Sequence, residues 1–107
     1  MKYNVFIVSD AEDDLYEIYN YVSLHDSKKK AEKLFEKIEQ TCHSLKSFPE
    51  RGHTPPELER IGIFEFRESH YKPYRIIYQI EDLSVFIHCI LDGRRSLQEL
   101  LEHRLLK

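Results

Sequence analysis

The sequence predicts an α+β fold: an N-terminal strand, an antiparallel helical hairpin, three further strands and a short C-terminal helix. Two patterns predict it. Apolar residues recur at helical spacing between residues 11 and 45, and they alternate with a period of two between residues 63 and 91. Three prolines and a glycine between residues 48 and 58 separate the two patterns. The 107 residues suffice for one domain, 1–107, with a modest core.

The first elements are a strand from residue 3 to residue 8 and a helix that follows it directly. Apolar residues occupy both faces of the strand, so we expect both faces to be covered. Ser9 and Glu12 have the spacing of a capping box, and the first turn is acidic, which suits a helix N-terminus. We expect this helix to end between Leu24 and Asp26.

The second helix begins where Asp26 or Ser27 can cap it, and it carries an apolar stripe as far as Leu45. Because only a few residues connect the two helices, we expect them to lie antiparallel. Residues 48–58 are predicted to form a loop, since proline and glycine interrupt regular structure there.

Three strands are predicted at residues 63–68, 74–80 and 85–91, with turns between them. Such short connections favour an antiparallel meander. The helical hairpin then brings the first strand into the same sheet and covers one face of it. Ser96 and Glu99 form a second capping box, which is expected to open the last helix.

The composition argues against several classes of protein. The net charge is −3, so no global basic field indicates nucleic-acid binding. No apolar run approaches the roughly 20 residues that span a bilayer, and the N-terminus lacks a signal-peptide pattern. We therefore expect a cytoplasmic protein with no membrane contact, no metal and no cofactor. Cys42 and Cys89 lie in a predicted helix and strand, where reduced core thiols are expected.

Arginines near the end of the chain are the most informative residues. Arg75 interrupts an apolar strand pattern, and Arg94 and Arg95 follow the next strand directly. Arginine is rarely buried without a partner, and its planar guanidinium suits phosphate or carboxylate recognition. We therefore expect catalysis or recognition in this region. Two structural alternatives remain open: Arg75 could pair with Glu65 across the sheet, and Asp92 could pair with Arg75 or Arg94.

The order of motifs resembles the RelE/ParE superfamily of toxins from bacterial type II toxin–antitoxin modules. The resemblance covers nearly the whole chain and rests on short pieces that follow one another in order: Ala11-Glu-Asp-Asp-Leu15, Leu45-Lys-Ser-Phe-Pro49, Arg51-Gly52, Pro56-Glu57-Leu58, Phe66-Arg67-Glu68, Tyr74-Arg75-Ile76-Ile77-Tyr78 and Gly93-Arg94-Arg95. It implies the fold described above and a toxin that a cognate antitoxin neutralises. RelE-like members cut messenger RNA on the ribosome, whereas ParE-like members poison DNA gyrase.

The residues favour the ParE-like branch of this resemblance. RelE-like nucleases carry lysines on the second strand and a tyrosine or histidine near the last helix, where this chain has Glu65 and Leu101. A nuclease of that kind would use Arg75 and Arg95, with His88 as a proton carrier. We therefore expect a gyrase inhibitor that breaks no bond itself. The alternatives are a ribosome-dependent endoribonuclease and a homologue that binds antitoxin but has lost toxicity.

The resemblance also suggests two contact surfaces. The surface for the target would comprise Arg67, Arg75, Asp92, Arg94 and Arg95. The surface for the antitoxin would lie on the first helix and take an amphipathic helix or strand onto an apolar groove. Its residues would be Leu15, Tyr16, Tyr19 and Val22.

Overall fold

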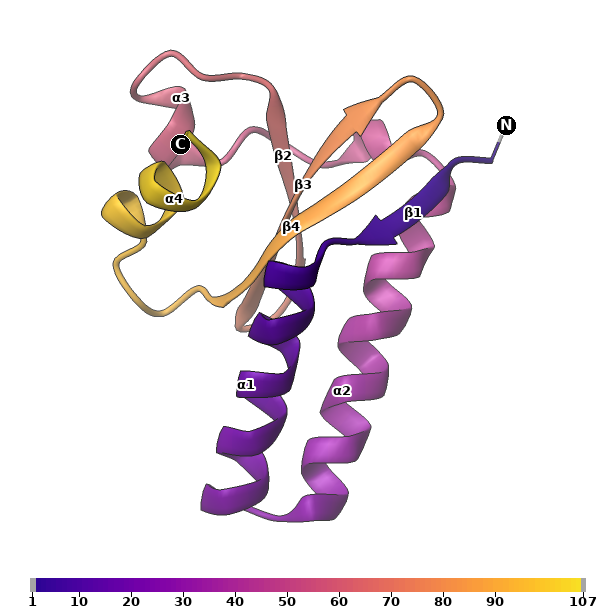
Figure 1. Cartoon of the computed structure of the whole chain (residues 1–107), viewed down its shortest axis with the longest axis vertical. Helices are drawn as coiled ribbons and strands as arrows, with labels where there is room; N and C mark the ends of the chain where they lie inside the picture. The colour runs from indigo at the N-terminus through magenta and orange to yellow at the C-terminus, as the bar shows by residue number, and fades with distance from the viewer. Residues whose placement is uncertain (1, 107) are drawn as a thin grey trace.

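The computed structural model describes residues 2–106 and confirms the predicted α+β fold. In chain order the elements are β1 (Asn4–Ile7), α1 (Ser9–His25), α2 (Lys28–His43), the 3-10 turns Ser44–Lys46 and Pro49–Arg51, α3 (Pro56–Glu59), β2 (Phe66–Tyr71), β3 (Tyr74–Glu81), β4 (Ser84–Asp92) and α4 (Gln98–Leu105). Figure 1 shows the α1–α2 hairpin below the sheet, with α3 and α4 together at its upper left. The two pairs of helices therefore cover different parts of the sheet.

The four strands form one sheet in the order β1-β4-β3-β2. As predicted, β2, β3 and β4 are an antiparallel meander, and the hairpin brings β1 alongside β4, to which it is parallel. The expectation that both faces of the first strand are covered is wrong. Strand β1 is an edge strand, and Phe6 is 48% exposed while its ring stacks on Phe86 with centroids 5.4 Å apart.

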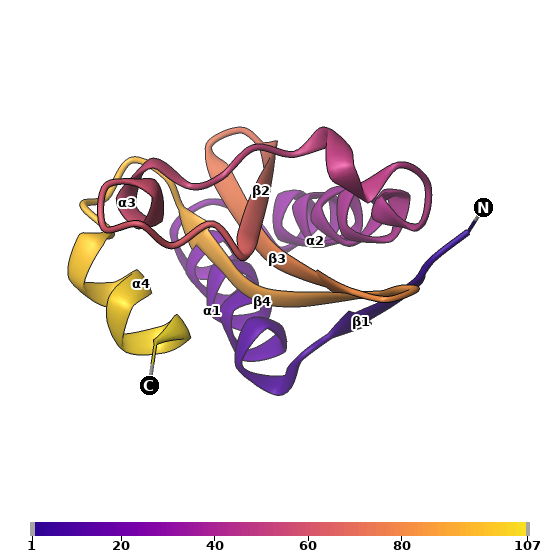
Figure 2. The ribbon, with the colours of Figure 1, turned by 90° about the horizontal axis from the view of Figure 1, so that it is seen from above.

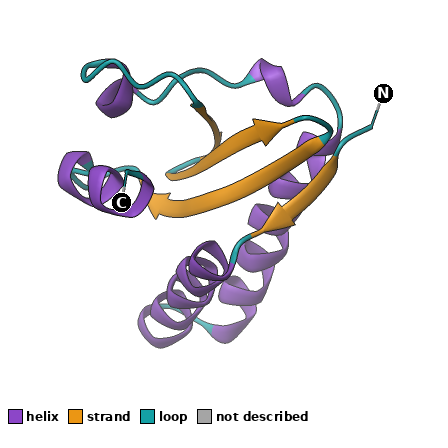
Figure 3. Ribbon diagram, turned by 45° about the horizontal axis from the view of Figure 1, so that its top comes forward, coloured by secondary structure: helices purple, strands orange, loops and turns teal. Residues whose placement is uncertain are grey.

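Two apolar clusters lie on opposite faces of the sheet. The first packs Leu15 of α1 and Ile38 of α2 against the strands, and the second packs Leu58 of α3 and Leu101 of α4 against them. Seen from above, α1 and α2 lie on one side of β3 and β4, and α3 and α4 lie at their far end (Figure 2). Figure 3 shows the C-terminal helix at the opposite end of the sheet from the N-terminus. The second cluster therefore anchors the short helices that surround the predicted site.

A bulge in β4 distributes its side chains between the two clusters. The register passes from Ile77 opposite Cys89 to Tyr78 opposite Ile87, which leaves His88 as an extra residue. Cys89 consequently faces the second cluster, whereas Ile87 faces the first. The prediction of two reduced core thiols is confirmed, because Cys42 and Cys89 are both free and buried, and burial raises the pKa of each to about 12.

The predicted helix caps are only partly correct. The hydroxyl of Ser27 accepts from the Lys30 amide at 3.1 Å and caps α2 as expected. The two capping boxes are wrong: the N-cap of α1 is Val8 and that of α4 is Leu97, and neither makes a side-chain cap. Both helices are instead held by packing of their apolar faces, which decides helix stability more than a single cap does.

The segment between the hairpin and the second strand is more ordered than predicted. Residues 48–58 contain a 3-10 turn and the first residues of the short helix α3, whose Leu58 is fully buried. Strand β2 begins at Phe66 and runs to Tyr71, later than the predicted range 63–68, and Phe64 before it is 63% exposed. This shift moves every residue of the strand relative to β3, which matters for the partners of Arg75.

Within residues 2–106, none of the helices combines the length and the apolar character needed to cross a bilayer.

Candidate functional site

Arg75 is held between two carboxylates instead of projecting into solvent. Its Nη1 and Nη2 donate to Glu57 of α3 at 2.6 and 2.7 Å, and its Nε and Nη2 donate to Glu68 of β2 at 2.7 and 3.1 Å. The three side chains are only 12%, 13% and 2% exposed. These bonds raise the pKa of Arg75, and the bond from Arg75 lowers the pKa of Glu57. Arg75 therefore fastens α3 to the sheet.

The alternative in which Arg75 pairs with Glu65 is wrong. Glu65 is exposed and precedes β2, whereas Glu68 lies within the strand, opposite Ile77. Side chains of β2 alternate between faces, so Phe66 and Glu68 share the face that also carries Arg75. The later start of β2 is the reason that Glu68, and not Glu65, meets the guanidinium.

Arg94 forms the pair with Asp92 that the sequence left open. Its Nη2 and Nε donate to the Asp92 carboxylate at 2.7 and 3.0 Å, and its backbone amide donates to the same carboxylate at 2.9 Å. The hydrogen bond from Arg94 lowers the pKa of Asp92. The Arg94 side chain remains 71% exposed. An exposed pair of this kind contributes little to stability, so Arg94 stays available to a partner.

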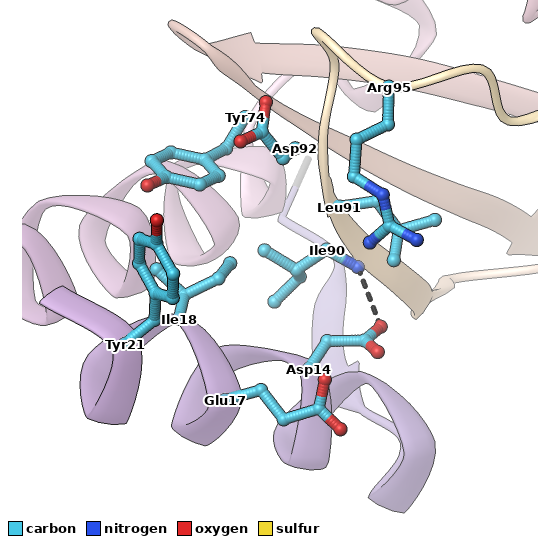
Figure 4. A pocket seen from close by; sticks show the side chains of 9 residues that line it. All are labelled: Asp14, Glu17, Ile18, Tyr21, Tyr74, Ile90, Leu91, Asp92 and Arg95. Carbon is cyan, nitrogen blue, oxygen red and sulfur yellow. Dashed lines mark hydrogen bonds between the residues drawn. The ribbon is translucent and has the colours of Figure 1, made fainter.

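Arg95 lines a pocket of about 380 Å³ between α1 and the end of β4. In the view of Figure 4, Tyr21 and Tyr74 lie on one side of this pocket, and Arg95 and Asp14 lie on the other. Burial and Asp92 together raise the pKa of Tyr74, with burial the larger cause. The pocket thus combines two phenols and an apolar floor with an exposed arginine at its edge.

The same pocket contains a buried carboxylate that the sequence analysis missed. Asp14 of α1 accepts from the Ile90 amide at 3.0 Å, as Figure 4 shows, and from both terminal nitrogens of Arg104 at 3.0 and 2.9 Å. Arg104 Nη2 also donates to the His88 carbonyl at 2.9 Å. This clamp connects α1, β4 and α4. Its only signal in the sequence is that Asp14 falls beside Leu15, on the apolar stripe of the helix.

The residues named for a nuclease do not converge in the described structure. His88 contacts the Gln79 amide oxygen at 3.2 Å and the edge of Phe66, and burial lowers its pKa. Gln79 lies four residues along β3 from Arg75, which is about 13 Å of strand. Arg95 lines a pocket with Tyr74, which belongs to the first apolar cluster, whereas the Phe66 that His88 contacts belongs to the second. Leu101 is fully buried in the second cluster and supplies no proton donor.

Arg67, also named for the target surface, is used inside the molecule. Its Nη1 donates to the carbonyl oxygens of Glu50 and Gly52 at 3.0 and 2.8 Å. It thereby holds the segment after α2 against β2. Of the five residues predicted for that surface, Arg94 and Arg95 are the exposed cations, and Asp92 is the last residue of β4.

A second hollow lies on the helical hairpin and contains two of the residues predicted for antitoxin contact. Tyr16 and Tyr19 of α1 surround Phe35 of α2, with ring centroids 5.4 and 6.0 Å from it. Glu32 and Glu36 complete a groove of about 500 Å³. Tyr16 is 51% exposed. This aromatic floor with an acidic rim is hereafter called the hairpin groove.

The other two residues predicted for that contact are placed differently. Leu15 is 2% exposed and belongs to the first apolar cluster, so it is not available to a partner. Val22 is half-buried and does not line the groove. Helical spacing put all four residues on one side of α1, but that side is divided between the core and the groove.

Comparison with known proteins gives one consistent result. Residues 5–97 match the family model described as ParE toxin of type II toxin-antitoxin system, parDE. Toxin ParE3 of Caulobacter vibrioides is 32% identical over 84 residues, which are 78% of this chain and 80% of that protein.

Two solved structures have the same fold. The chromosomal ParDE system from P. aeruginosa gives a TM-score of 0.70 at 18% identity and covers 83% of this chain and 94% of that one. The RelBE2 toxin-antitoxin complex from Mycobacterium tuberculosis gives a TM-score of 0.64 at 18% identity and covers 86% and 92%. At this identity the two structures bear on the fold alone.

Proposed function

The chain belongs to the ParE toxin family of type II toxin–antitoxin systems, and on this premise we propose that it inhibits growth by binding DNA gyrase in the cytoplasm. A cognate antitoxin neutralises it in the hairpin groove. The mechanism is binding, and the chain itself cleaves no bond.

Gyrase is favoured over RNA cleavage because only some of the arginines are free to meet a partner. Arg75 is neutralised by Glu57 and Glu68, so it has no charge to spare for a phosphate. Arg94 and Arg95, in contrast, are exposed after the end of β4. Exposed cations of this kind suit recognition of a large partner.

The first test replaces both exposed arginines. The R94A/R95A variant is expected to lose growth inhibition and to weaken gyrase-mediated DNA cleavage about tenfold or more, since an arginine at the centre of an interface contributes about 2 kcal/mol. The measurements are induced expression in a sensitive bacterium without antitoxin, and DNA cleavage by gyrase with the purified protein. The stability in urea should remain that of the parent, because both side chains are exposed.

The alternatives give different results in the same assays. Cleavage of translated messages with gyrase unaffected would contradict the proposal in favour of an endoribonuclease. If the parent causes no growth defect, the result would support the alternative in which this chain binds antitoxin but has lost toxicity. A matched control is K29A, which removes an exposed cation in the first turn of α2 that does not line the pocket, and it should behave as the parent does.

The chemistry of the hairpin groove favours a particular kind of antitoxin segment. Its aromatic floor suits apolar anchors of an amphipathic helix, and Glu32 and Glu36 at the rim suit lysine or arginine beside those anchors. The groove lies on the hairpin, whereas Arg94 and Arg95 follow β4, so antitoxin and target use separate surfaces under this proposal.

The second test replaces Tyr16 in this groove. The Y16S variant is expected to bind the antitoxin about tenfold more weakly, because the phenol ring is half exposed and can be buried by a partner. Titration calorimetry with the antitoxin encoded beside this gene measures the change. The control is L24S on the same helix, where Leu24 is 83% exposed but does not line the groove. Equal losses in Y16S and L24S, or none in Y16S, would contradict the assignment of the groove.

A further inference from the structure

Glu68 and His70 of β2 meet His53, from the segment before α3, on the side of the sheet that faces away from the helical hairpin. His53 Nε2 lies 3.1 Å from Glu68 Oε2, and His70 Nε2 lies 3.3 Å from Glu68 Oε1. Their three ligand atoms all lie within 4.8 Å of one another. Bonds of about 2.0–2.2 Å to a tetrahedral ion separate neighbouring ligand atoms by about 3.3–3.6 Å. The two histidine–glutamate contacts, which involve different carboxylate oxygens, are close to this range, and the remaining separation lies within 4.8 Å.

The backbone fixes these residues relative to one another. The amide of Glu68 donates to the His53 carbonyl at 2.7 Å, and the two residues form an isolated β-bridge. His70 lies two residues beyond Glu68 in β2, so both side chains emerge on the same face. The two imidazole rings have centroids 5.5 Å apart. A ligand set of this kind therefore needs side-chain rotation only, and no rearrangement of the chain.

Arg75 holds Glu68 in one orientation. It donates to both carboxylate oxygens, at 2.7 and 3.1 Å. A carboxylate has about four lone-pair positions, so two of them remain free to face the histidines and accept an ion. Support of this kind from a neighbouring group is typical of metal ligands, whose orientation depends on hydrogen bonds behind them.

The local charge is compatible with a cation despite the arginine. Glu57 and Glu68 supply two negative charges against the single positive charge of Arg75, which leaves one net negative charge when both histidines are neutral. The Glu68 side chain is only 2% exposed, whereas His53 and His70 are 60% and 41% exposed. An ion could thus enter from the side of the imidazoles and meet a carboxylate that is already desolvated.

We propose that His53, Glu68 and His70 form a site for a divalent first-row transition metal, with Zn²⁺ as its representative. Two imidazole nitrogens and one carboxylate oxygen favour such ions over Mg²⁺ and Ca²⁺, which prefer oxygen ligands. The fourth position faces solvent and is open to water or to a group from a partner. The bound ion connects the segment after α2 to β2. This site does not depend on the proposed function.

The test uses the full chain without a histidine tag, freed of metal by a chelator. Titration calorimetry with Zn²⁺ is expected to give one equivalent of binding, and Zn²⁺ but not Mg²⁺ is expected to raise the melting temperature. The H53A and H70A variants should each weaken Zn²⁺ binding by at least about tenfold. H43A is the control, because His43 is exposed at the end of α2 and lies outside the cluster.

Both histidines are exposed, so the two variants should fold and the result remains interpretable. The proposal is overturned if the parent shows no saturable binding at one equivalent. It is equally overturned if the H53A/H70A variant binds Zn²⁺ as tightly as the parent does, since binding would then reside elsewhere on the surface.

Discussion

Replacing Arg75 with alanine is expected to lower the free energy of unfolding by about 3–5 kcal/mol, because it leaves two carboxylates without their partner. Glu57 and Glu68 are 13% and 2% exposed, and both receive two hydrogen bonds from this one guanidinium. A domain of this size has about 5–15 kcal/mol of stability in total, so the loss is a large share. Urea denaturation followed by circular dichroism measures it.

Two variants separate the ion pairs from the loss of a side chain. R95A removes an exposed guanidinium and is expected to change the unfolding free energy by less than about 0.5 kcal/mol. R75K keeps the charge but cannot span both carboxylates, so it should fall between R75A and the parent. A parent-like midpoint for R75A would mean that the two carboxylates reach water easily, and it would return Arg75 to the candidates for target contact.

A comparison of the parent with R75A should also depend on pH. The hydrogen bond from Arg75 lowers the pKa of Glu57 below its unfolded value. A carboxyl of this kind stabilises the fold above its unfolded pKa of about 4.3, and the contribution is lost as the pH falls through the folded pKa. The stability difference between the parent and R75A should therefore be constant near neutral pH and become smaller below about pH 4.

The fold was predictable because its signals are periodic and extend over many residues. The helical stripe from Ala11 to Leu45 and the alternation from Tyr74 to Leu91 each involve enough positions to identify their elements. Ser27 was predictable as a cap for a different reason, because serine directly before a helical pattern is a favoured N-cap residue. The capping boxes at Ser9 and Ser96 failed, since their spacing is short and packing of the helix decided where each one begins.

The candidate site was predictable only in part. The sequence identified Arg75 as unusual, and the structure agrees that an arginine in an apolar strand needs a partner. It could not identify Glu57, which is 18 residues away in a segment predicted to be a loop. It also placed β2 at residues 63–68, and a strand that starts at Phe66 makes Glu68 the inward carboxylate. Long-range pairing depends on register, which no local pattern fixes.

The arginines of the last third therefore have different roles. Arg75 and Arg104 are structural, because each is bonded to carboxylates of another element. Arg94 and Arg95 are the exposed members, and Asp92 restrains the first of them. This division predicts that growth inhibition and stability can be separated by mutation. Variants at the exposed positions should lose activity without unfolding, and variants at the structural positions should lose both.

Replacing Asp14 with alanine is expected to cost about 3 kcal/mol and to release the C-terminal helix. The change removes the acceptor of the Ile90 amide and the partner of Arg104, whose pKa the Asp14 bond raises. Arg104 is 17% exposed, so its charge can regain water only if α4 moves. Hydrogen exchange should therefore become faster at the Ile90 amide and along α4, while α2 stays protected.

D14N and D14A distinguish the bond from the Ile90 amide from the ion pair with Arg104. D14N keeps an acceptor for the Ile90 amide but loses the charge, so it is expected to cost less than D14A while still loosening α4. A double-mutant cycle of D14A with R104A isolates the contribution of the pair, and a coupling of more than about 1 kcal/mol is expected for a clamp. Additive losses, with exchange in α4 unchanged, would show instead that α4 is held by Leu97 and Leu101 alone.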